Sequence, residues 1–467
     1  MLVVLLAAAL SAAAFYLSTG LGELWPLAWI APVPLLWLAF DGRRPPVFLP
    51  AALAAFVGNL NLFGYLSRVA PQPIVIGSLL IPALALAGCV VFAGRVARRV
   101  PPVLAVFAFP AAWTTYEFLL SLVSPHGTAL NLAYSQTDVL TLLQVVSVTG
   151  LWGLLFLLML VPSALALALA RRTPAPLVPA AGLACVVVAF GMWRLHQPIE
   201  GAPIRVGLAV TDHDIGRVYD TRDTPTALAI ARGYADRVAR LAGRGAQVVV
   251  LPEKLTGVTT ANTREVERLF ADAARDAKAT VVVGLNRVDS NPLRNVALVY
   301  APDGGQMVEY DKRHMLPGPE SGYVVGRVPA QFTAAGQPWG VAICKDMDFQ
   351  EWSRAYAAEG VRILAVPAWD FVVDARLHWR MALARGVENG VAMVRPAEMG
   401  LLTVTDGYGR TVASVRSDSG PEVLLLADIQ PGPGATFYTR HGDWFGWVAV
   451  GAFAALAIGR GRQERAN

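Results

Sequence analysis

Long apolar runs fill the first part of the chain, and short apolar runs alternate with polar segments further on. An α-helix needs about 20 apolar residues to cross a bilayer, and somewhat shorter helices also occur. The sequence therefore predicts eight membrane-spanning helices: Leu2–Leu17, Leu24–Phe40, Val47–Leu66, Ile74–Gly94, Val103–Val123, Val145–Ala170, Leu177–Trp193 and Trp444–Gly459. A more polar segment, residues 194–443, separates the seventh helix from the eighth.

Arginines are spread unevenly over the connections between these predicted helices. Alternate connections and the C-terminal tail are rich in them: Arg43, Arg44, Arg95, Arg98, Arg99, Arg171, Arg172, Arg460, Arg462 and Arg465. Arg68 is the one basic residue in the intervening short connections. Because basic residues collect in cytoplasmic loops, both termini are expected in the cytoplasm. The sequence thus predicts a membrane domain (1–193), an extracytoplasmic domain (194–443) and a final helix with a cytoplasmic tail (444–467).

Composition agrees with a membrane protein and argues against other classes. Hydrophobic residues make up 55% of the chain and charged residues 16%, with a mean hydropathy of +0.47, whereas soluble proteins carry about 25% charged residues. Much of the excess arginine behind the net charge of +5 lies in short connections, which argues against nucleic acid as a partner. The three cysteines and six histidines show neither disulfide nor metal-binding spacing, so we expect no metal and no cofactor.

Lysine is scarce in this chain. Four lysines, at positions 254, 278, 312 and 345, stand against 35 arginines. A chain that uses arginine for nearly every surface cation has few reasons to keep a lysine. One reason is chemistry, because a lysine amine can be tuned and can donate to a developing charge. For any single lysine, chance is an equally good explanation.

Within the polar segment, short β-branched runs alternate with helical patterns. The predicted strands are 204–210, 247–251, 280–285, 296–300, 339–344 and 362–367, and the predicted helices are 225–242, 263–277, 349–359 and 375–389. Paired strands are expected at 400–415 and 423–429, around the turn Asp406-Gly407. This alternation predicts an α/β domain in which helices cover a sheet.

Three ionisable residues follow predicted strands of this domain. Glu253 ends VVVLPE, Lys312 ends MVEYDK and Cys344 ends WGVAIC. Because sites in α/β folds collect at the carboxyl ends of strands, these side chains are candidates for one site. Each also has a structural explanation when taken singly. A cysteine that closes an apolar strand is usually a core residue, and the other two are compatible with solvated loop positions.

Together the three residue types suit acyl transfer. A carboxylate can take the proton of an attacking thiol. An ammonium and backbone N–H groups can stabilise the oxyanion that then forms. Glu253, Lys312 and Cys344 therefore make up a complete set for nucleophilic catalysis without metal or cofactor.

The order Glu, Lys and Cys, each after a strand, resembles the nitrilase superfamily, whose fold is an α-β-β-α sandwich. Within it the chain is similar to apolipoprotein N-acyltransferases, a membrane branch with eight spans around an external nitrilase-like domain. Three further stretches resemble that family: NLAYSQTDVLTLLQVVSVTGLWGLLFL (131–157), KRHMLPGPE (312–320) and TFYTRHGDWFGW (436–447). The resemblance covers nearly the whole chain, and the fold it implies is a membrane helix bundle plus the sandwich.

The resemblance also implies roles for individual residues. Glu253 would be the general base and acid, Lys312 would stabilise the intermediate, and Cys344 would carry the acyl group. Glu320 would be a second essential glutamate, and Asp346 stands where the family usually has glutamate. Lys345 replaces the usual tyrosine, and in a regular strand its side chain would point away from Cys344.

The chain also departs from the family pattern. Trp369 lies in VPAWDFVVD, where the family usually has a segment such as NDAWFG, and the family's later Asn-rich turn is missing. The apolar stretch from Trp369 to Val373 is open to two interpretations, a wall of the lipid pocket or core packing, and neither is favoured. His378 is open to two interpretations, a ligand contact or a packed helix histidine, and the second is favoured.

The function implied is transfer of a fatty acyl chain from a phospholipid to the N-terminal amine of a diacylglyceryl-cysteine on a lipoprotein. The partners would be the phospholipid donor, the lipoprotein acceptor and the bilayer, at the periplasmic side of a bacterial inner membrane, with the enzyme acting as a monomer. A membrane-tethered amidase that uses water as the acceptor is the alternative. A catalytically silent scaffold is disfavoured by the intact Glu–Lys–Cys set.

Overall fold

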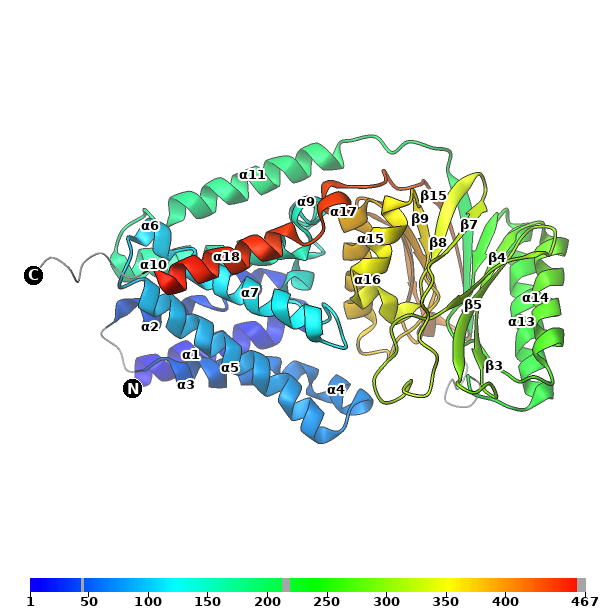
Figure 1. Ribbon diagram of the computed structural model, residues 1–467, viewed down its shortest axis with the longest axis horizontal. Coiled ribbons are helices and arrows are strands. Elements are labelled where there is room, and N and C mark those ends of the chain that lie inside the picture. The colour runs from blue at the N-terminus through cyan, green and yellow to red at the C-terminus, as the bar shows by residue number, and fades with distance from the viewer. Residues whose placement is uncertain (43–45, 212–218, 460–467) are drawn as a thin grey trace, which may run out of the picture. The chain divides into compact units, whose positions relative to one another are not determined.

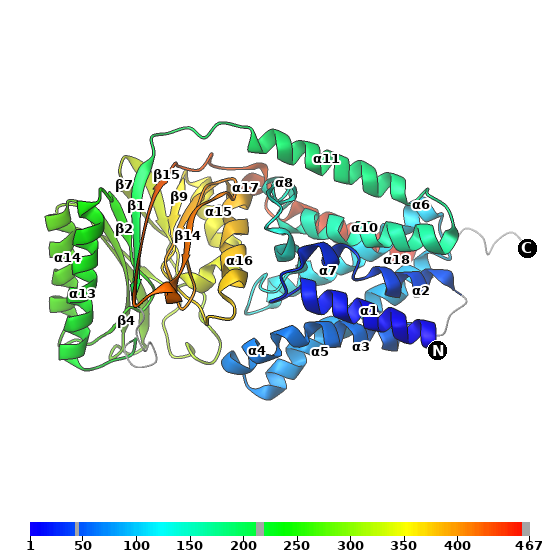
Figure 2. The same cartoon turned by 180° about the vertical axis from the view of Figure 1, so that it is seen from behind.

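The computed structural model describes residues 1–42, 46–211 and 219–459, and it divides into two compact units (Figure 1, Figure 2). One unit comprises Met1–His196 and His441–Asn467, and the other comprises Gln197–Arg440. The first is helical and the second is built on β-sheets. Several arginines used for the predicted orientation lie outside the described residues: Arg43, Arg44, Arg460, Arg462 and Arg465.

Apolar helices make up the first unit. Its main helices are α1 (Leu2–Ser18), α2 (Val33–Asp41), α3 (Phe48–Asn59), α4 (Phe63–Val69), α5 (Gln72–Val96), α7 (Ala108–Val123), α10 (Leu151–Arg171), α11 (Leu177–Leu195) and α18 (Trp444–Ile458). Among the described residues, five segments are long and apolar enough to cross a membrane: Phe48–Val69, Gln72–Val96, Pro102–Val123, Leu151–Arg171 and Leu177–Leu195. Shorter apolar helices lie at Leu2–Ser18, Trp25–Asp41, Leu140–Thr149 and Trp444–Ile458.

These helices also expose apolar side chains. Leu5 is 60% exposed, Leu169 63% and Val178 70%. Exposed apolar surface on a helical bundle suits contact with lipid rather than water. The predicted class, a membrane helix bundle, is therefore confirmed, whereas the count of eight spans stays a prediction.

One predicted span begins later than expected. The run Val145–Ala170 is predicted as a single helix, but α9 (Val146–Thr149) ends at Gly150, whose φ of 63° lies in the left-handed region. The long helix α10 starts only at Leu151. Glycine adopts this conformation without the steric cost that other residues bear, so it separates the two helices.

Two sheets face each other in the second unit. Within the described residues the first sheet has the order β15-β1-β2-β4-β5-β6, with β3 beside β4. Its strands are β1 (Ile204–Thr211), β2 (Val248–Val250), β3 (Gly257–Val258), β4 (Thr280–Arg287), β5 (Arg294–Tyr300), β6 (Gln306–Asp311) and β15 (Glu422–Ile429). The second has the order β14-β13-β11-β9-β8-β7. Its strands are β7 (Ala330–Ala334), β8 (Gln337–Val341), β9 (Ile363–Ala365), β11 (Ala392–Arg395), β13 (Leu401–Thr405) and β14 (Thr411–Arg416).

Helices cover the outer face of each sheet (Figure 1). Helices α13 (Thr224–Gly243) and α14 (Thr263–Ala277) lie on the first sheet, and α15 (Glu351–Ala358) and α16 (Ala375–Asn389) lie on the second. The core follows from alternation along the strands. Val206 and Leu208 of β1 point between the sheets, whereas Ala209 points toward α13 and α14. The predicted α-β-β-α sandwich is confirmed.

The functional side chains lie just beyond strand ends of both sheets. Glu253 follows β2 by three residues, and Lys312 directly follows β6. The strand predicted to run to Cys344 ends at Val341, and Cys344 begins a short 3-10 turn, Cys344–Asp348. The prediction of a regular strand up to Cys344 is therefore wrong, because this residue has a left-handed φ of 40°.

Candidate active site

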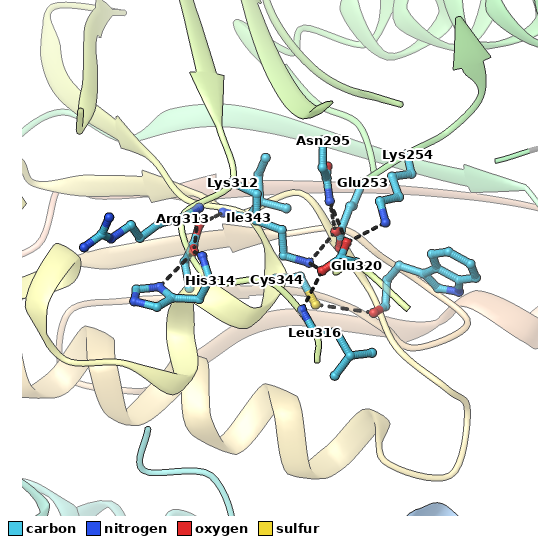
Figure 3. A network of polar contacts seen from close by, with 12 residues as sticks. Glu253, Lys254, Asn295, Lys312, Arg313, His314, Leu316, Glu320, Ile343 and Cys344 are labelled. Atoms are coloured by element: carbon cyan, nitrogen blue, oxygen red, sulfur yellow. Dashed lines mark hydrogen bonds and ion pairs between the residues drawn. The ribbon is translucent and has the colours of Figure 1, made fainter. Parts of the chain in front are cut away.

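A buried ammonium joins two buried carboxylates in the second unit (Figure 3). Lys312 Nζ donates to Glu253 Oε1 at 2.8 Å and to Glu320 Oε2 at 2.9 Å. The three residues are only 3–4% exposed. Charged groups are buried in proteins when they are paired in this way, because an unpaired charge loses its hydration without compensation.

Further donors complete the carboxylate cluster. Asn295 Nδ2 lies 2.6 Å from Glu253 Oε1 and 3.1 Å from Glu320 Oε1. The backbone N–H of Leu316 donates to Glu320 Oε2 at 2.8 Å. Lys254 Nζ donates to Glu320 Oε1 at 2.5 Å. Glu320, predicted as a second glutamate, therefore lies in the same cluster as Glu253 and Lys312.

The Cys344 thiol lies beside this cluster, where it interacts electrostatically with Glu253 and Lys312 (Figure 3). Sγ donates to the Trp369 carbonyl oxygen at 3.3 Å, and the Cys344 backbone N–H donates to the Pro367 carbonyl at 2.9 Å. Cys344 is 9% exposed. The structure thus brings Glu253, Lys312 and Cys344 together from two sheets.

Asp346 anchors the backbone on both sides of the site. Its Oδ1 accepts from the backbone N–H groups of Arg313, at 3.2 Å, and His314, at 2.8 Å. Its Oδ2 accepts from the backbone N–H of Ile343, at 2.9 Å, and the hydroxyl of Tyr310, at 2.7 Å. One carboxylate therefore fixes both the segment that carries Lys312 and the turn that carries Cys344.

Trp369 contributes to the site through its backbone. Its backbone carbonyl accepts the hydrogen bond from the Cys344 thiol. Its side chain is held in place as well: the indole N–H donates to Met399 Sδ at 3.3 Å, and the ring packs on Tyr219 at 4.8 Å between centroids. The next residue, Asp370, pairs with Arg395 at 2.5 Å inside the protein. This ion pair holds the loop against the second sheet.

Electrostatics differ between the thiol and the ammonium. Burial raises the pKa of the Cys344 thiol well above its usual value, and the nearby Glu253 carboxylate adds to this. Burial alone would lower the pKa of Lys312, but Glu253 and Glu320 raise it well above its usual value. Burial would raise the pKa of Glu320, but Lys312 and Lys254 bring it below its usual value. The resting site therefore holds a neutral thiol beside a permanent cation, so the thiol needs a base to react.

Two residues considered in the sequence analysis, His378 and Lys345, pair with nearby carboxylates. His378 Nε2 lies 2.9 Å from Oδ2 of Asp374, the residue just before α16, which agrees with the favoured packed-histidine interpretation. Lys345 Nζ pairs with Asp348 at 3.0 Å. The argument that Lys345 points away from Cys344 along a regular strand does not hold, because both residues lie in the 3-10 turn.

Sequence reasoning missed Asn295 and Lys254. Asn295 lies on β5, beside β4 and far from the three motifs, so no local pattern points to its amide. The scarcity of lysine in the sequence was the signal that could have pointed to Lys254. In the structure Lys254, Lys312 and Lys345 are all buried. The three are 3–6% exposed.

Two family models match this chain. The apolipoprotein N-acyltransferase N-terminal domain matches residues 7–165, and the carbon-nitrogen hydrolase family matches residues 215–432. The apolipoprotein N-acyltransferase of Geobacter metallireducens is 29% identical, over 92% of this chain and 90% of its own. That of Gloeobacter violaceus is 27% identical, over 94% and 92%.

Amidases match a smaller share of this chain. An omega-amidase of Mus musculus is 26% identical over 41% of this chain and 79% of its own. Among solved structures, an amidase from Nesterenkonia sp. superimposes with a TM-score of 0.43 at 21% identity, covering 53% of this chain and 98% of its own.

The sandwich, the buried Glu–Lys–Cys cluster and the carbon-nitrogen hydrolase match define a nitrilase-like enzyme domain, here joined to a helical membrane domain. Relatives that share both parts over nearly the whole chain are apolipoprotein N-acyltransferases. The chain is thus similar to apolipoprotein N-acyltransferases over nearly its whole length, and the predicted resemblance is confirmed.

Proposed function

We propose that this membrane enzyme transfers a fatty acyl chain from a phospholipid to the N-terminal amine of a diacylglyceryl-cysteine on a lipoprotein, through a thioester on Cys344. Lipoprotein N-acylation is the activity that its relatives and its N-terminal domain support. The observation that carries the residue assignment is the buried contact of Lys312 with Glu253 and Glu320 beside the Cys344 thiol.

In the first half-reaction the Cys344 sulfur attacks the ester carbonyl carbon of the phospholipid. Glu253 takes the thiol proton as the C–S bond forms, and Lys312 stabilises the negative oxygen of the tetrahedral intermediate. The C–O bond then breaks, and Glu253 returns the proton to the departing alcohol. A lysophospholipid leaves, and the acyl group stays on Cys344 as a thioester.

In the second half-reaction the neutral α-amine of the lipoprotein attacks the thioester carbonyl. Glu253 takes a proton from the attacking nitrogen, and Lys312 again lies next to the oxyanion. The C–S bond breaks, the amide is released, and the proton passes from Glu253 to the sulfur. The enzyme returns to its resting protonation state, with neutral thiol and ionised carboxylate.

The Trp369 loop supports a lipid substrate. The backbone carbonyl of Trp369 accepts a hydrogen bond from the Cys344 thiol. The residues that follow expose apolar side chains, with Val372 38% and Val373 42% exposed. Exposed valines on the loop that contacts the reactive sulfur suit an acyl chain, and an apolar site also keeps water from the thioester. We assign Trp369 and this loop to the acyl-chain site.

Topology follows from the same proposal. Residues 1–193 and 444–467 form the membrane domain, and residues 194–443 form the catalytic domain outside the cytoplasm, where the positive-inside rule places them. All three reacting side chains belong to one chain, so a monomer suffices for both half-reactions.

A two-substrate assay tests the function. The purified full chain in detergent is given dipalmitoyl phosphatidylethanolamine and a synthetic diacylglyceryl-cysteine peptide, and the peptide mass is followed. We expect the peptide to gain one palmitoyl group, and Cys344→Ser to abolish this gain while Cys185→Ser, at an exposed cysteine, retains it. Release of ammonia from short amides without any gain in peptide mass would instead establish the amidase alternative.

A further inference from the structure

The second cation of the site, Lys254, has no role in the mechanism above. Three of the four lysines of this chain are buried, whereas Lys278, past the end of α14, is exposed. Lys254 directly follows the proposed general base Glu253 and is 6% exposed. Its φ of 48° is left-handed, a conformation that costs free energy for a residue with a side chain. The fold therefore tolerates an unfavourable backbone conformation at Lys254, which places an ammonium next to Glu253.

Lys254 points into the carboxylate cluster from the side opposite Lys312 (Figure 3). Its Nζ donates to Glu320 Oε1 at 2.5 Å, while Lys312 Nζ donates to Glu320 Oε2 at 2.9 Å. Two aromatic rings also face the ammonium, Tyr323 at 4.5 Å and Tyr219 at 5.9 Å from the ring centroid. Glu320 is thus held between two ammonium groups, one on each carboxylate oxygen.

Close packing leaves Lys254 little freedom to move. Gly284 of β4 lies against the turn that carries it, and a Cβ at Gly284 would approach Pro252 O to 2.4 Å and Glu253 Cα to 2.7 Å. The Leu255 N–H donates to the Gly284 carbonyl at 3.1 Å. The backbone of the turn that carries Lys254 is consequently fixed by the sheet.

The charges of the four groups can be counted through the reaction. Glu253, Glu320, Lys312 and Lys254 sum to zero in the resting site. When Glu253 takes the thiol proton the four side chains sum to +1, and the oxyanion that forms in the same step brings the total for the site to zero. Without Lys254 the sum at the oxyanion stage would be −1, in a buried site where a net charge is poorly solvated.

We propose that Lys254 is a positioning residue of acyl transfer, which neutralises Glu320 so that Lys312 remains available to the developing oxyanion. The inference rests on the proposed function for Cys344 and Glu253 and adds a fourth charged group to it. The groups that face Lys254 are Glu320, Tyr219 and Tyr323. Those that act on the thiol are Glu253, Lys312, Asp370 and Arg395.

The test measures alkylation of Cys344 by iodoacetamide as a function of pH, on the full chain in detergent, with peptide mass spectrometry to read each cysteine separately. Alkylation needs neither phospholipid nor lipoprotein, so its result is independent of whether the proposed substrates are right. We expect Lys254→Met to move the pH midpoint upward and to slow alkylation about tenfold at pH 8, because an unneutralised Glu320 then competes with the thiolate for the charge of Lys312. Lys278→Met, the same change at an exposed lysine, is expected to behave as wild type.

Two further variants separate charge from packing. Lys254→Arg keeps the cation and is expected to stay within about threefold of the wild-type rate. Lys254→Met combined with Glu320→Gln removes one charge of each sign, and we expect it to restore the pH midpoint toward the wild-type value. A wild-type midpoint in Lys254→Met, or a double variant no closer to wild type than the single one, would overturn the inference.

Acyl transfer provides the second readout. If Lys254 acts through charge, Lys254→Met lowers the rate of thioester formation on Cys344 and Lys254→Arg recovers most of it. An equal loss in both variants, at every pH, would show a purely structural role and overturn the proposal. An altered alkylation profile in a protein that never forms a thioester would contradict the proposed function while leaving the electrostatic role of Lys254 intact.

Discussion

Asp346 Oδ1 lies 2.8 Å from the backbone nitrogen of His314, although the two residues are 32 positions apart. This contact joins the segment that follows β6 to the turn that follows β8. Because the first carries Lys312 and the second carries Cys344, the distance between ammonium and thiol depends on a carboxylate that touches neither. Correct placement of reacting groups contributes several kcal/mol to catalysis, and errors of about 1 Å are costly.

Asp346→Asn should therefore impair catalysis more than its small change in shape implies. One half of the new amide is a donor that would face backbone N–H groups, so at least one buried hydrogen bond is lost. We expect thioester formation on Cys344 to fall about 100-fold, measured by single-turnover mass spectrometry. Asp303→Asn, on an exposed turn, serves as the control, and equal rates in the two variants would show that Asp346 does not position the site.

Glu253→Gln tests the general base. The amide cannot accept the thiol proton, and the burial of Cys344 keeps that thiol neutral at physiological pH. The rate of thioester formation should drop by about 10²–10⁴, the usual contribution of general base catalysis. Glu265→Gln, at an exposed position of α14, is the matched control. A Glu253→Gln enzyme with wild-type acylation rates would assign the base to another group.

The pair of His378 and Asp374 should make the stability of the catalytic domain depend on pH. Burial would lower the pKa of His378, but Asp374 and other carboxylates raise it to about 9. A raised pKa stabilises the fold fully below the unfolded-state value of about 6.5, and this contribution disappears as the pH rises through 9. Thermal unfolding of wild type and His378→Gln should thus differ most at pH 6 and converge near pH 10. Curves that differ equally at both pH values would contradict this linkage.

Arg395 and Asp370 form a buried ion pair behind the thiol. Removing one partner of such a pair leaves an unpaired charge in the interior, at a cost of roughly 3–5 kcal/mol. We expect Arg395→Met to lower the unfolding temperature of the catalytic domain markedly, as measured by differential scanning fluorimetry in detergent. The double variant with Asp370→Leu should recover much of the loss. Failure of the double variant to recover any stability would show that the guanidinium acts through packing alone.

Local periodicity predicts most elements of the sandwich. The helices expected at 263–277 and 375–389 have these bounds in the structure, as α14 and α16. In α14 the buried positions Val266, Phe270 and Ala274 recur every four residues, which is the spacing of one helix face. Where the apolar pattern and the local backbone preference agree, the sequence alone predicts the bounds of the helix.

Backbone conformations without a sequence signature were not predictable. Cys344, Lys254, Val372 and Met399 all have positive φ, between 40° and 65°, and all lie on loops around the site. None is a glycine, so the sequence gives no sign of the turns they form. Such strain is held by surrounding contacts and is common at functional sites. This is why the strand predicted through Cys344 ends three residues earlier.

Polar contacts between residues far apart in the sequence also could not be predicted from local sequence patterns. The strand ends indicated Glu253, Lys312 and Cys344, because an ionisable side chain is conspicuous after an apolar strand. Asn295 joins Glu253 to Glu320 across neighbouring strands, and its amide is unremarkable in the sequence. The convergence of two sheets at one site is a property of the fold and not of any motif.

Mass spectrometry of the full chain after incubation with dipalmitoyl phosphatidylethanolamine, without any acceptor, tests the central claim most directly. We expect one palmitoyl group on the peptide that contains Cys344, labile to neutral hydroxylamine and missing in Cys344→Ala. An unmodified Cys344 peptide from an enzyme that still acylates lipoprotein peptides would contradict it.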